Sequence, residues 1–244
     1  MKLGIIADIH GNLQALTQAL ETLDARNVDL ILCAGDLVCY GANPNQVLDL
    51  LRECGIPSVI GNYGAAVAWN HPRASRTPSS PMTEPLKQEA LDWTKRCVTV
   101  ENLRYLRGLP WMLHYRLDDL RIQVLHAGLD HLDQALSPDW PEGLADLAAR
   151  LPADVIILGH THQAYTYVCD DTVFVNPGAV GRSLNGDTRA AYAILDTTTR
   201  QATLHRVAYD VDAAVRAIAT SGMSPAIATL IRHGARRIEE VVTV

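Results

Sequence analysis

Hydrophobic residues in the first 60 positions alternate between short continuous runs and helically spaced sets. Residues 2–7, 29–34 and 58–60 are short apolar runs, whereas segments 12–26 and 45–54 repeat leucine or valine every three or four positions. Short buried strands that alternate with amphipathic helices are typical of a layered α/β sheet with parallel strands. This part of the chain therefore predicts three parallel strands connected by two helices.

In the rest of the chain, the predicted strands are connected by short hairpin turns rather than by helices. Two-residue acidic turns at Asp118-Asp119 and Asp170-Asp171 separate apolar segments that favour paired strands. The further predicted elements are a hairpin over 190–208, a single strand over 154–158, helices over 87–97 and 101–107, and two helices over 211–241 broken at Gly222 and Pro225. This mixture predicts either one mixed sheet or a sandwich of two sheets. With no repeat and no linker, it also predicts a single domain over residues 1–244, with a C-terminal helical tail over about 211–244.

One long segment has no periodicity. Residues 70–85 contain four prolines and several serines and threonines, which predicts a surface loop. Long loops inside compact domains are often functional. We interpret this segment as a lid or a substrate selector.

Composition narrows the class of protein. The chain has 244 residues, of which 48% are hydrophobic, and a formal net charge of −6. This balance favours a globular protein without a strong nucleic-acid surface, and no window is long and apolar enough for a membrane span. The five cysteines form no CxxC pair, and the N-terminal apolar run meets Asp8 at once. Both features favour a cytoplasmic protein with reduced thiols.

Metal-ligand residue types follow the predicted strands. Ligand sites of open α/β sheets lie at the carboxyl ends of strands, so short polar signatures there are expected to converge. Seven candidate metal ligands result: Asp8, His10, Asp36, Asn62, His126, His160 and His162. These are too many for one tetrahedral ion but suit two ions that share a carboxylate.

The spacing of these residues suggests how they face one ion. Asp8 and His10 are two positions apart, as are His160 and His162, so each pair would point the same way on an extended backbone. Mixed oxygen and nitrogen ligands without cysteine favour manganese, iron or zinc over copper, and suit calcium less well.

The complete set resembles a known family. Asp8-x-His10, Gly35-Asp36, Gly61-Asn62, His126 and Gly159-His160-x-His162 are similar to the calcineurin-like metallophosphoesterase superfamily over about residues 1–200. Residues 36–44 and 176–181 further resemble its small bacterial and archaeal phosphodiesterases, which include diadenosine tetraphosphatase-related proteins. The resemblance implies an α/β (α+β) fold, a four-layer α/β/β/α sandwich of two mixed β-sheets flanked by helices.

The resemblance also implies roles for the seven residues. Asp36 would bridge two ions, and a water or hydroxide between the ions would attack phosphorus, with Asp36, Asn62 and His126 as the catalytic residues. The expected ions are manganese or iron, with zinc, nickel or cobalt as alternatives. The implied ligand sets are Asp8, His10, Asp36 and His162 for the first metal, and Asp36, Asn62, His126 and His160 for the second.

The sequence departs from the family after Asn62. Tyr63 stands where many members have a histidine that protonates the leaving group, which favours substrates with good leaving groups. Gly64 stands where an aspartate is expected, so Asn62 would lack an orienting carboxylate.

Other residues have two interpretations each. Arg182 would bind a phosphate from a flexible loop, because Leu184 occupies the position where relatives often have arginine; it could equally be a solvated loop residue. Asn12 would face the substrate or cap the following helix, Tyr63 would contact the substrate, and His131 would reach the substrate or lie on the surface.

These observations predict a metal-dependent phosphodiesterase that acts on a small phosphate-ester substrate, either a nucleotide-like or generic diester or an anhydride. The alternatives are a phosphoprotein phosphatase and a weakly active or non-catalytic metal-binding member of the same fold. A homo-oligomer formed through the C-terminal helices is a further possibility.

Overall fold

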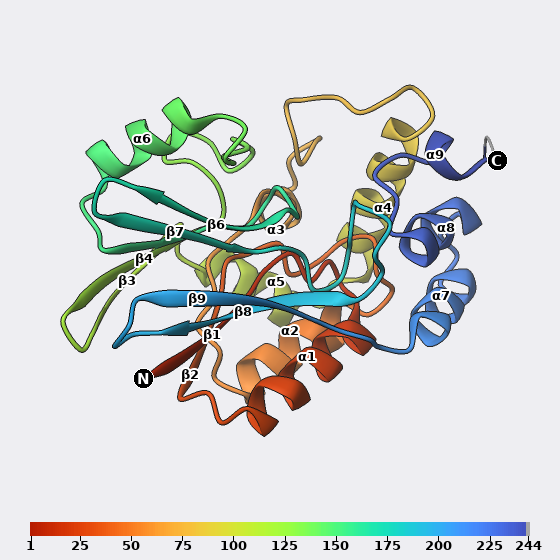
Figure 1. The fold of residues 1–244 in the computed structure, drawn as a ribbon. Coiled ribbons are helices and arrows are strands. Elements are labelled where there is room, and N and C mark those ends of the chain that lie inside the picture. The colour runs from red at the N-terminus through yellow and green to blue at the C-terminus, as the bar shows by residue number, and fades with distance from the viewer. Residues whose placement is uncertain (243–244) are drawn as a thin grey trace.

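A computed structural model describes residues 1–242; residues 243–244, the end of the predicted tail, lie outside the described residues. The chain forms two mixed β-sheets packed face to face, with helices on both outer faces (Figure 1). The four-stranded sheet has the order β2 (Leu30–Cys33), β1 (Lys2–Ile6), β8 (Ala190–Asp196), β9 (Gln201–Val207). The five-stranded sheet has the order β3 (Met112–Leu117), β4 (Leu120–Leu125), β5 (Val155–Ile157), β7 (Thr172–Pro177), β6 (Ala164–Cys169).

Each sheet combines parallel pairs with antiparallel hairpins, and the parallel strand β2 forms one edge of the four-stranded sheet. β1 pairs in parallel with β2, and β5 pairs in parallel with both β4 and β7. The predicted hairpins form β3–β4, β6–β7 and β8–β9. This confirms the predicted sandwich of two mixed sheets.

Nine helices of the described chain surround the sheets. They are α1 (Leu13–Ala25), α2 (Pro44–Glu53), α3 (Asn62–Ala68), α4 (Glu84–Cys97), α5 (Val100–Gly108), α6 (Pro141–Arg150), α7 (Val211–Thr220), α8 (Pro225–His233) and α9 (Glu239–Val242). α1 packs on the four-stranded sheet and α6 on the five-stranded sheet (Figure 1). No helix within residues 1–242 combines the length and the apolar character needed to cross a bilayer.

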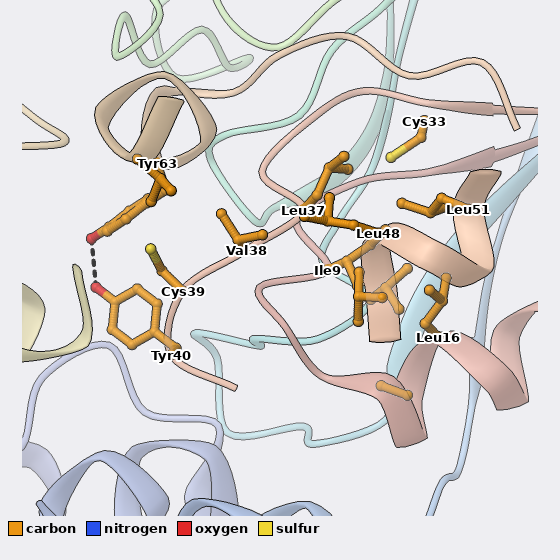
Figure 2. Packing of buried hydrophobic residues seen from close by; sticks show 14 of the residues in the cluster. Ile9, Leu16, Cys33, Leu37, Val38, Cys39, Tyr40, Leu48, Leu51 and Tyr63 are labelled. Atoms are coloured by element: carbon orange, nitrogen blue, oxygen red, sulfur yellow. Dashed lines mark hydrogen bonds between the residues drawn. The ribbon is translucent and has the colours of Figure 1, made fainter. Parts of the chain in front are cut away.

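Successive side chains of a strand point to opposite faces of its sheet. One hydrophobic core therefore lies between the two sheets, and a further core lies on the outer face of each sheet. Val155 and Ile157 of β5 pack between the sheets with Leu3 and Ile5 of β1, whereas Ile156 faces outward beneath α6. Burying each such side chain contributes about 1.5–3 kcal/mol. The core on the outer face of the four-stranded sheet continues toward Tyr40 and Tyr63, whose hydroxyls are hydrogen bonded (Figure 2).

One predicted strand is absent, and three helices were not predicted. Residues 58–60 do not form a strand: Ser58 makes one isolated parallel bridge to Cys33, and the backbone N–H of Ile60 donates to Pro110. α3 and α6 were not predicted, and the tail forms a third short helix, α9.

Candidate metal centre

Loops from both sheets bring the seven candidate ligands together. Asp8 and His10 follow β1, Asp36 follows β2, His126 follows β4, and His160 and His162 lie between β5 and β6. Asn62 is the first residue of α3. Because β1, β2, β4 and β5 run in register within their parallel pairs, their carboxyl ends open at one end of the sandwich.

Two overlapping groups of acidic and histidine side chains form the centre. The ligand atoms of Asp8, His10 and His162 all lie within 4.8 Å of one another, and so do those of Asp8, Asp36 and His126. The Nε2 atoms of His10 and His162 are 3.1 Å apart, and the Nε2 atom of His126 is 3.4 Å from the Asp36 carboxylate. Asp8, not Asp36, belongs to both groups.

The backbone of these loops is left-handed rather than extended. Asp8 and His10 have φ angles of 54° and 49°, and His160 and His162 have φ angles of 67° and 58°. The prediction that each pair points the same way because the backbone is extended was therefore wrong. The side chains meet because each residue turns the chain sharply.

Backbone carbonyls fix the tautomers of three histidines. The Nδ1 atoms of His10, His126 and His162 contact the carbonyl oxygens of Val38, Ala34 and Arg182 respectively. A carbonyl can only accept, so each Nδ1 donates a hydrogen bond. His10 and His162 are neutral and present the lone pair of Nε2 toward the centre, whereas His126, whose pKa is raised to about 9, carries a second proton on Nε2. This arrangement is typical of metal-binding histidines.

Asn62 connects the remaining histidine to the centre. Its side-chain oxygen lies 2.9 Å from Nε2 of His126 and 3.0 Å from Nδ1 of His160. Its side-chain amide donates to the carbonyl of Ala74 over 3.0 Å. A loop carbonyl therefore orients Asn62.

Gly64 has no direct part in this arrangement. A Cβ atom at position 64 would lie 3.3 Å from Ile60 and 3.8 Å from Leu106, inside the apolar core. The geometry gives no support to the hypothesis that Gly64 leaves Asn62 poorly oriented.

Burial shifts most side chains of the centre toward their neutral forms. Burial is the main cause that raises the pKa of Asp8 to about 8, and the negative charge of Asp36 raises it as well. Burial also lowers the pKa values of His10 and His160 to about 4, so both are neutral at pH 7. Neutral imidazoles bind a metal ion without first losing a proton.

His126 and Asp36 stabilise each other's charged forms. Although burial acts against charge on both, the Asp36 carboxylate raises the pKa of His126 to about 9, and His126 holds the pKa of Asp36 below its usual range. With this pKa, His126 carries a second proton at pH 7, and a cation bound beside Asp36 would take the place of that proton.

The distances also fit metal ions. Ligand atoms that lie about 2.0–2.2 Å from one ion are about 2.8–3.6 Å apart. The contacts between His126 and Asp36 and between His162 and Asp8 measure 3.4 and 3.5 Å. The donor set of carboxylate, amide and imidazole groups matches the ligands preferred by manganese, iron and zinc.

Two predicted substrate contacts lie outside the ligand groups. Asn12 is buried, caps α1 by accepting from the N–H of Ala15, and donates to the carbonyl of Gly181 and to Tyr209. Of the two interpretations of Asn12, these contacts support the helix cap rather than the substrate contact. The hydroxyl of Tyr63 lies 2.6 Å from that of Tyr40, and burial raises its pKa well above 10.

Arg182 is not a solvated loop residue. It is only 7% exposed, and its guanidinium lies 4.1 Å above the ring of Tyr40. Its Nε atom is buried without a hydrogen-bond partner in the described chain. His131, in contrast, is exposed.

Sequence reasoning missed the residues that support the ligands. The amide of Asn176 donates to the carbonyl of Gly159 and to the hydroxyl of Thr161, which holds the turn that carries His160. Carbonyls such as those of Val38 and Ala74 carry no side-chain signal that a sequence could reveal.

Comparisons with known proteins identify the class. The family model described as the calcineurin-like phosphoesterase superfamily domain matches residues 1–200. The chain belongs to this family and is a phosphoesterase hydrolase with a buried cluster of aspartates and histidines.

Particular relatives come from archaea and bacteria. The chain is 29% identical over 233 residues to the uncharacterized protein MJ0912 of Methanocaldococcus jannaschii, covering 88% of this chain and 91% of that protein. It is 24% identical over 203 residues to the phosphodiesterase MJ0936 of the same organism, covering 82% and 96%. A metallophosphoesterase structure from Sphaerobacter thermophilus is 28% identical, with a TM-score of 0.78 over 96% of this chain and 99% of that chain.

Proposed function

We propose that this phosphoesterase is a metal-dependent phosphodiesterase that hydrolyses small nucleotide-like or generic phosphodiesters and phosphoanhydrides with two bound ions. The observation that carries the proposal is the convergence of Asp8 and Asp36 with the inward-facing Nε2 atoms of His10, His126 and His162. The relative described as a phosphodiesterase supports the same reaction class.

The ligand residues provide two adjoining half-sites. Asp8, His10 and His162 would hold one ion, and Asp36, Asn62, His126 and His160 would hold the other. When bound, such a pair supplies Lewis acidity that activates a water molecule and neutralises charge on the phosphoryl oxygens. Because Asp8 belongs to both groups of ligand atoms, we infer that it supports both half-sites together with Asp36.

The side chain at position 63 restricts the choice of leaving group. Tyr63 offers no imidazolium acid, and its buried hydroxyl is paired with Tyr40. A leaving group that departs without protonation is therefore favoured, as in aryl diesters and phosphoanhydrides. The alkoxide of an alkyl monoester needs a proton to depart, so such a monoester is not favoured.

Hydrolysis of bis(p-nitrophenyl) phosphate with added Mn²⁺ tests the proposal. We expect turnover, retained by His114→Ala on the exposed surface of β3 and reduced about 100-fold or more by His162→Ala, which removes a metal ligand. Metal content is measured on the same samples. The absence of turnover with two ions bound would refute the proposal in favour of a non-catalytic metal-binding protein.

Phosphopeptides and alkyl monoesters serve as comparison substrates. The proposal requires higher kcat/KM on the aryl diester than on either of them. A phosphopeptide that is hydrolysed faster than the diester would instead identify a phosphoprotein phosphatase.

A further inference from the structure

A cleft with two tryptophans opens beside the metal centre. Its volume is about 660 Å³, within the range of small-molecule sites, and Asn62 lies in its wall. Trp69 and Trp111 also line it, and they are 48% and 44% exposed. A ligand in this cleft would therefore contact aromatic rings while reaching a residue of the metal centre.

The two walls come from distant parts of the chain. Trp69 follows α3, and the segment after it returns through Ala74, whose carbonyl holds the Asn62 amide. Trp111 directly precedes β3. Across the cleft, Asp133 accepts from the backbone N–H and the guanidinium of Arg76, which joins the 69–83 segment to residues 131–133.

His71 extends the aromatic surface at Trp69. The ring of His71 stacks on that of Trp69, with centroids 6.3 Å apart and planes 28° apart. Stacking of a nucleobase on such an aromatic side chain contributes about 1–3 kcal/mol and tolerates different bases.

The cleft also favours an anion. Arg73 lines it and makes no salt bridge within 4.0 Å in the described chain, although its charge also acts on Glu84; the acidic Asp133 is paired with Arg76. A phosphate near Arg73 would form charge-assisted hydrogen bonds. The net charge of −6 argues against a long polyanion as the ligand.

We propose that this cleft, lined by Trp69 and Trp111 beside Asn62, is a nucleobase subsite that selects small nucleotide diesters as substrates. The proposal rests on the phosphodiesterase function for its role in turnover, but binding in the cleft does not require hydrolysis. The base stacks on the tryptophan surface, and the phosphate of the same nucleotide lies toward Asn62.

Calorimetric binding to the full-length, Mn²⁺-loaded protein tests this subsite. The probe is the phosphonate analogue of AMP, in which a methylene replaces the ester oxygen, and the comparison ligand is the same ribose phosphonate without a base. We expect the base to tighten binding about tenfold or more, since stacking alone accounts for about 5- to 150-fold.

Tryptophan variants locate the effect. Trp69→Ala and Trp111→Ala should each reduce the preference for the base-bearing ligand at least fivefold and leave the affinity for the base-free ligand unchanged. Trp140→Ala is the matched control, because Trp140 is 45% exposed but lies outside the cleft, and it should retain the preference.

The outcomes separate this inference from the proposed function. Equal affinity for both ligands, or a base preference that survives the double substitution of Trp69 and Trp111, overturns the subsite even if the protein hydrolyses diesters. A base preference lost in both variants upholds the subsite even if turnover is never observed.

Discussion

Asp133 should control how firmly the 69–83 segment closes the cleft. Its carboxylate accepts from the backbone N–H of Arg76 over 2.7 Å and from Nε over 3.0 Å. The Asp133 side chain is only 8% exposed, whereas that of Arg76 is 61% exposed. We predict that Asp133→Ala detaches the segment at this point and leaves the remaining fold intact.

The two kinds of contact contribute unequally. The backbone hydrogen bond to a carboxylate contributes about 1.5–3 kcal/mol when buried, and its exposure here places it near the lower value. The exposed ion pair adds about 0.2–1 kcal/mol. A total of about 2 kcal/mol corresponds to a roughly 30-fold larger open population.

Trypsin measures this population. The 69–83 segment contains Arg73 and Arg76 as cleavage sites, and when opening is fast relative to cleavage, the rate follows the open fraction. Cleavage at these sites should therefore accelerate about 30-fold in the variant. Urea unfolding is measured in parallel to separate local opening from global unfolding.

The matched control is Asp130→Ala. Asp130 is three positions away and pairs with Arg150 at 2.7 Å rather than with the 69–83 segment. It should leave cleavage at Arg73 and Arg76 unchanged. Equal cleavage rates in wild type and Asp133→Ala, at equal global stability, would refute the reasoning.

Three further predictions concern the centre and its support. Removing bound metal with a chelator should lower Tm by about 5–11 °C, because a ligand at 100 times its Kd stabilises the fold by about 2.7 kcal/mol; calorimetry checks this, and the same shift in His162→Ala would contradict it. Gly61→Ala should abolish metal binding as read by metal analysis, since its Cβ would lie 2.1 Å from Oδ1 of Asp36. The control is Gly108→Ala at the end of α5, which has open space around its Cβ and no positive φ and should bind metal normally. Tyr40→Phe should lower the free energy of unfolding by about 1–3 kcal/mol by leaving the Tyr63 hydroxyl unpaired, and Tyr40→Phe/Tyr63→Phe should recover part of it in urea titrations; strict additivity would argue against the pair.

Segments with a clear period were predictable from the sequence. The helix over 12–26 was expected from its leucine spacing, and α1 buries Leu16 and Leu23 on one side. α3 gave no such signal, because all seven of its residues are buried and no polar face sets a period. α6 did carry signals, namely Pro141 at its first turn and Leu144 and Leu147 at helical spacing, so this omission was avoidable.

The candidate site was predictable only where strand ends carry recognisable side chains. The seven candidate ligands could be selected because they belong to short polar signatures that follow an apolar run or a glycine, and the structure brings these side chains together. Trp69, Trp111 and Asp133 line one cleft although they are more than 20 residues apart and belong to no shared motif. Their proximity depends on tertiary packing, which spacing along the chain does not encode.

The left-handed backbone of the loops, which the extended prediction overlooked, explains why aspartate and histidine recur at the centre. Five of the seven candidate ligands, namely Asp8, His10, Asp36, His160 and His162, have φ angles between 49° and 67°. Among non-glycine residues, aspartate, asparagine and histidine adopt this region most readily, although each such residue costs about 1–3 kcal/mol. Backbone bonds from one ligand loop to another hold the strained positions: Asp8 donates to Gly35, and His10 to Asp36. These hydrogen bonds join the candidate ligands that follow β1 and β2, so a substitution that relaxes one loop should displace the candidate ligands in the other.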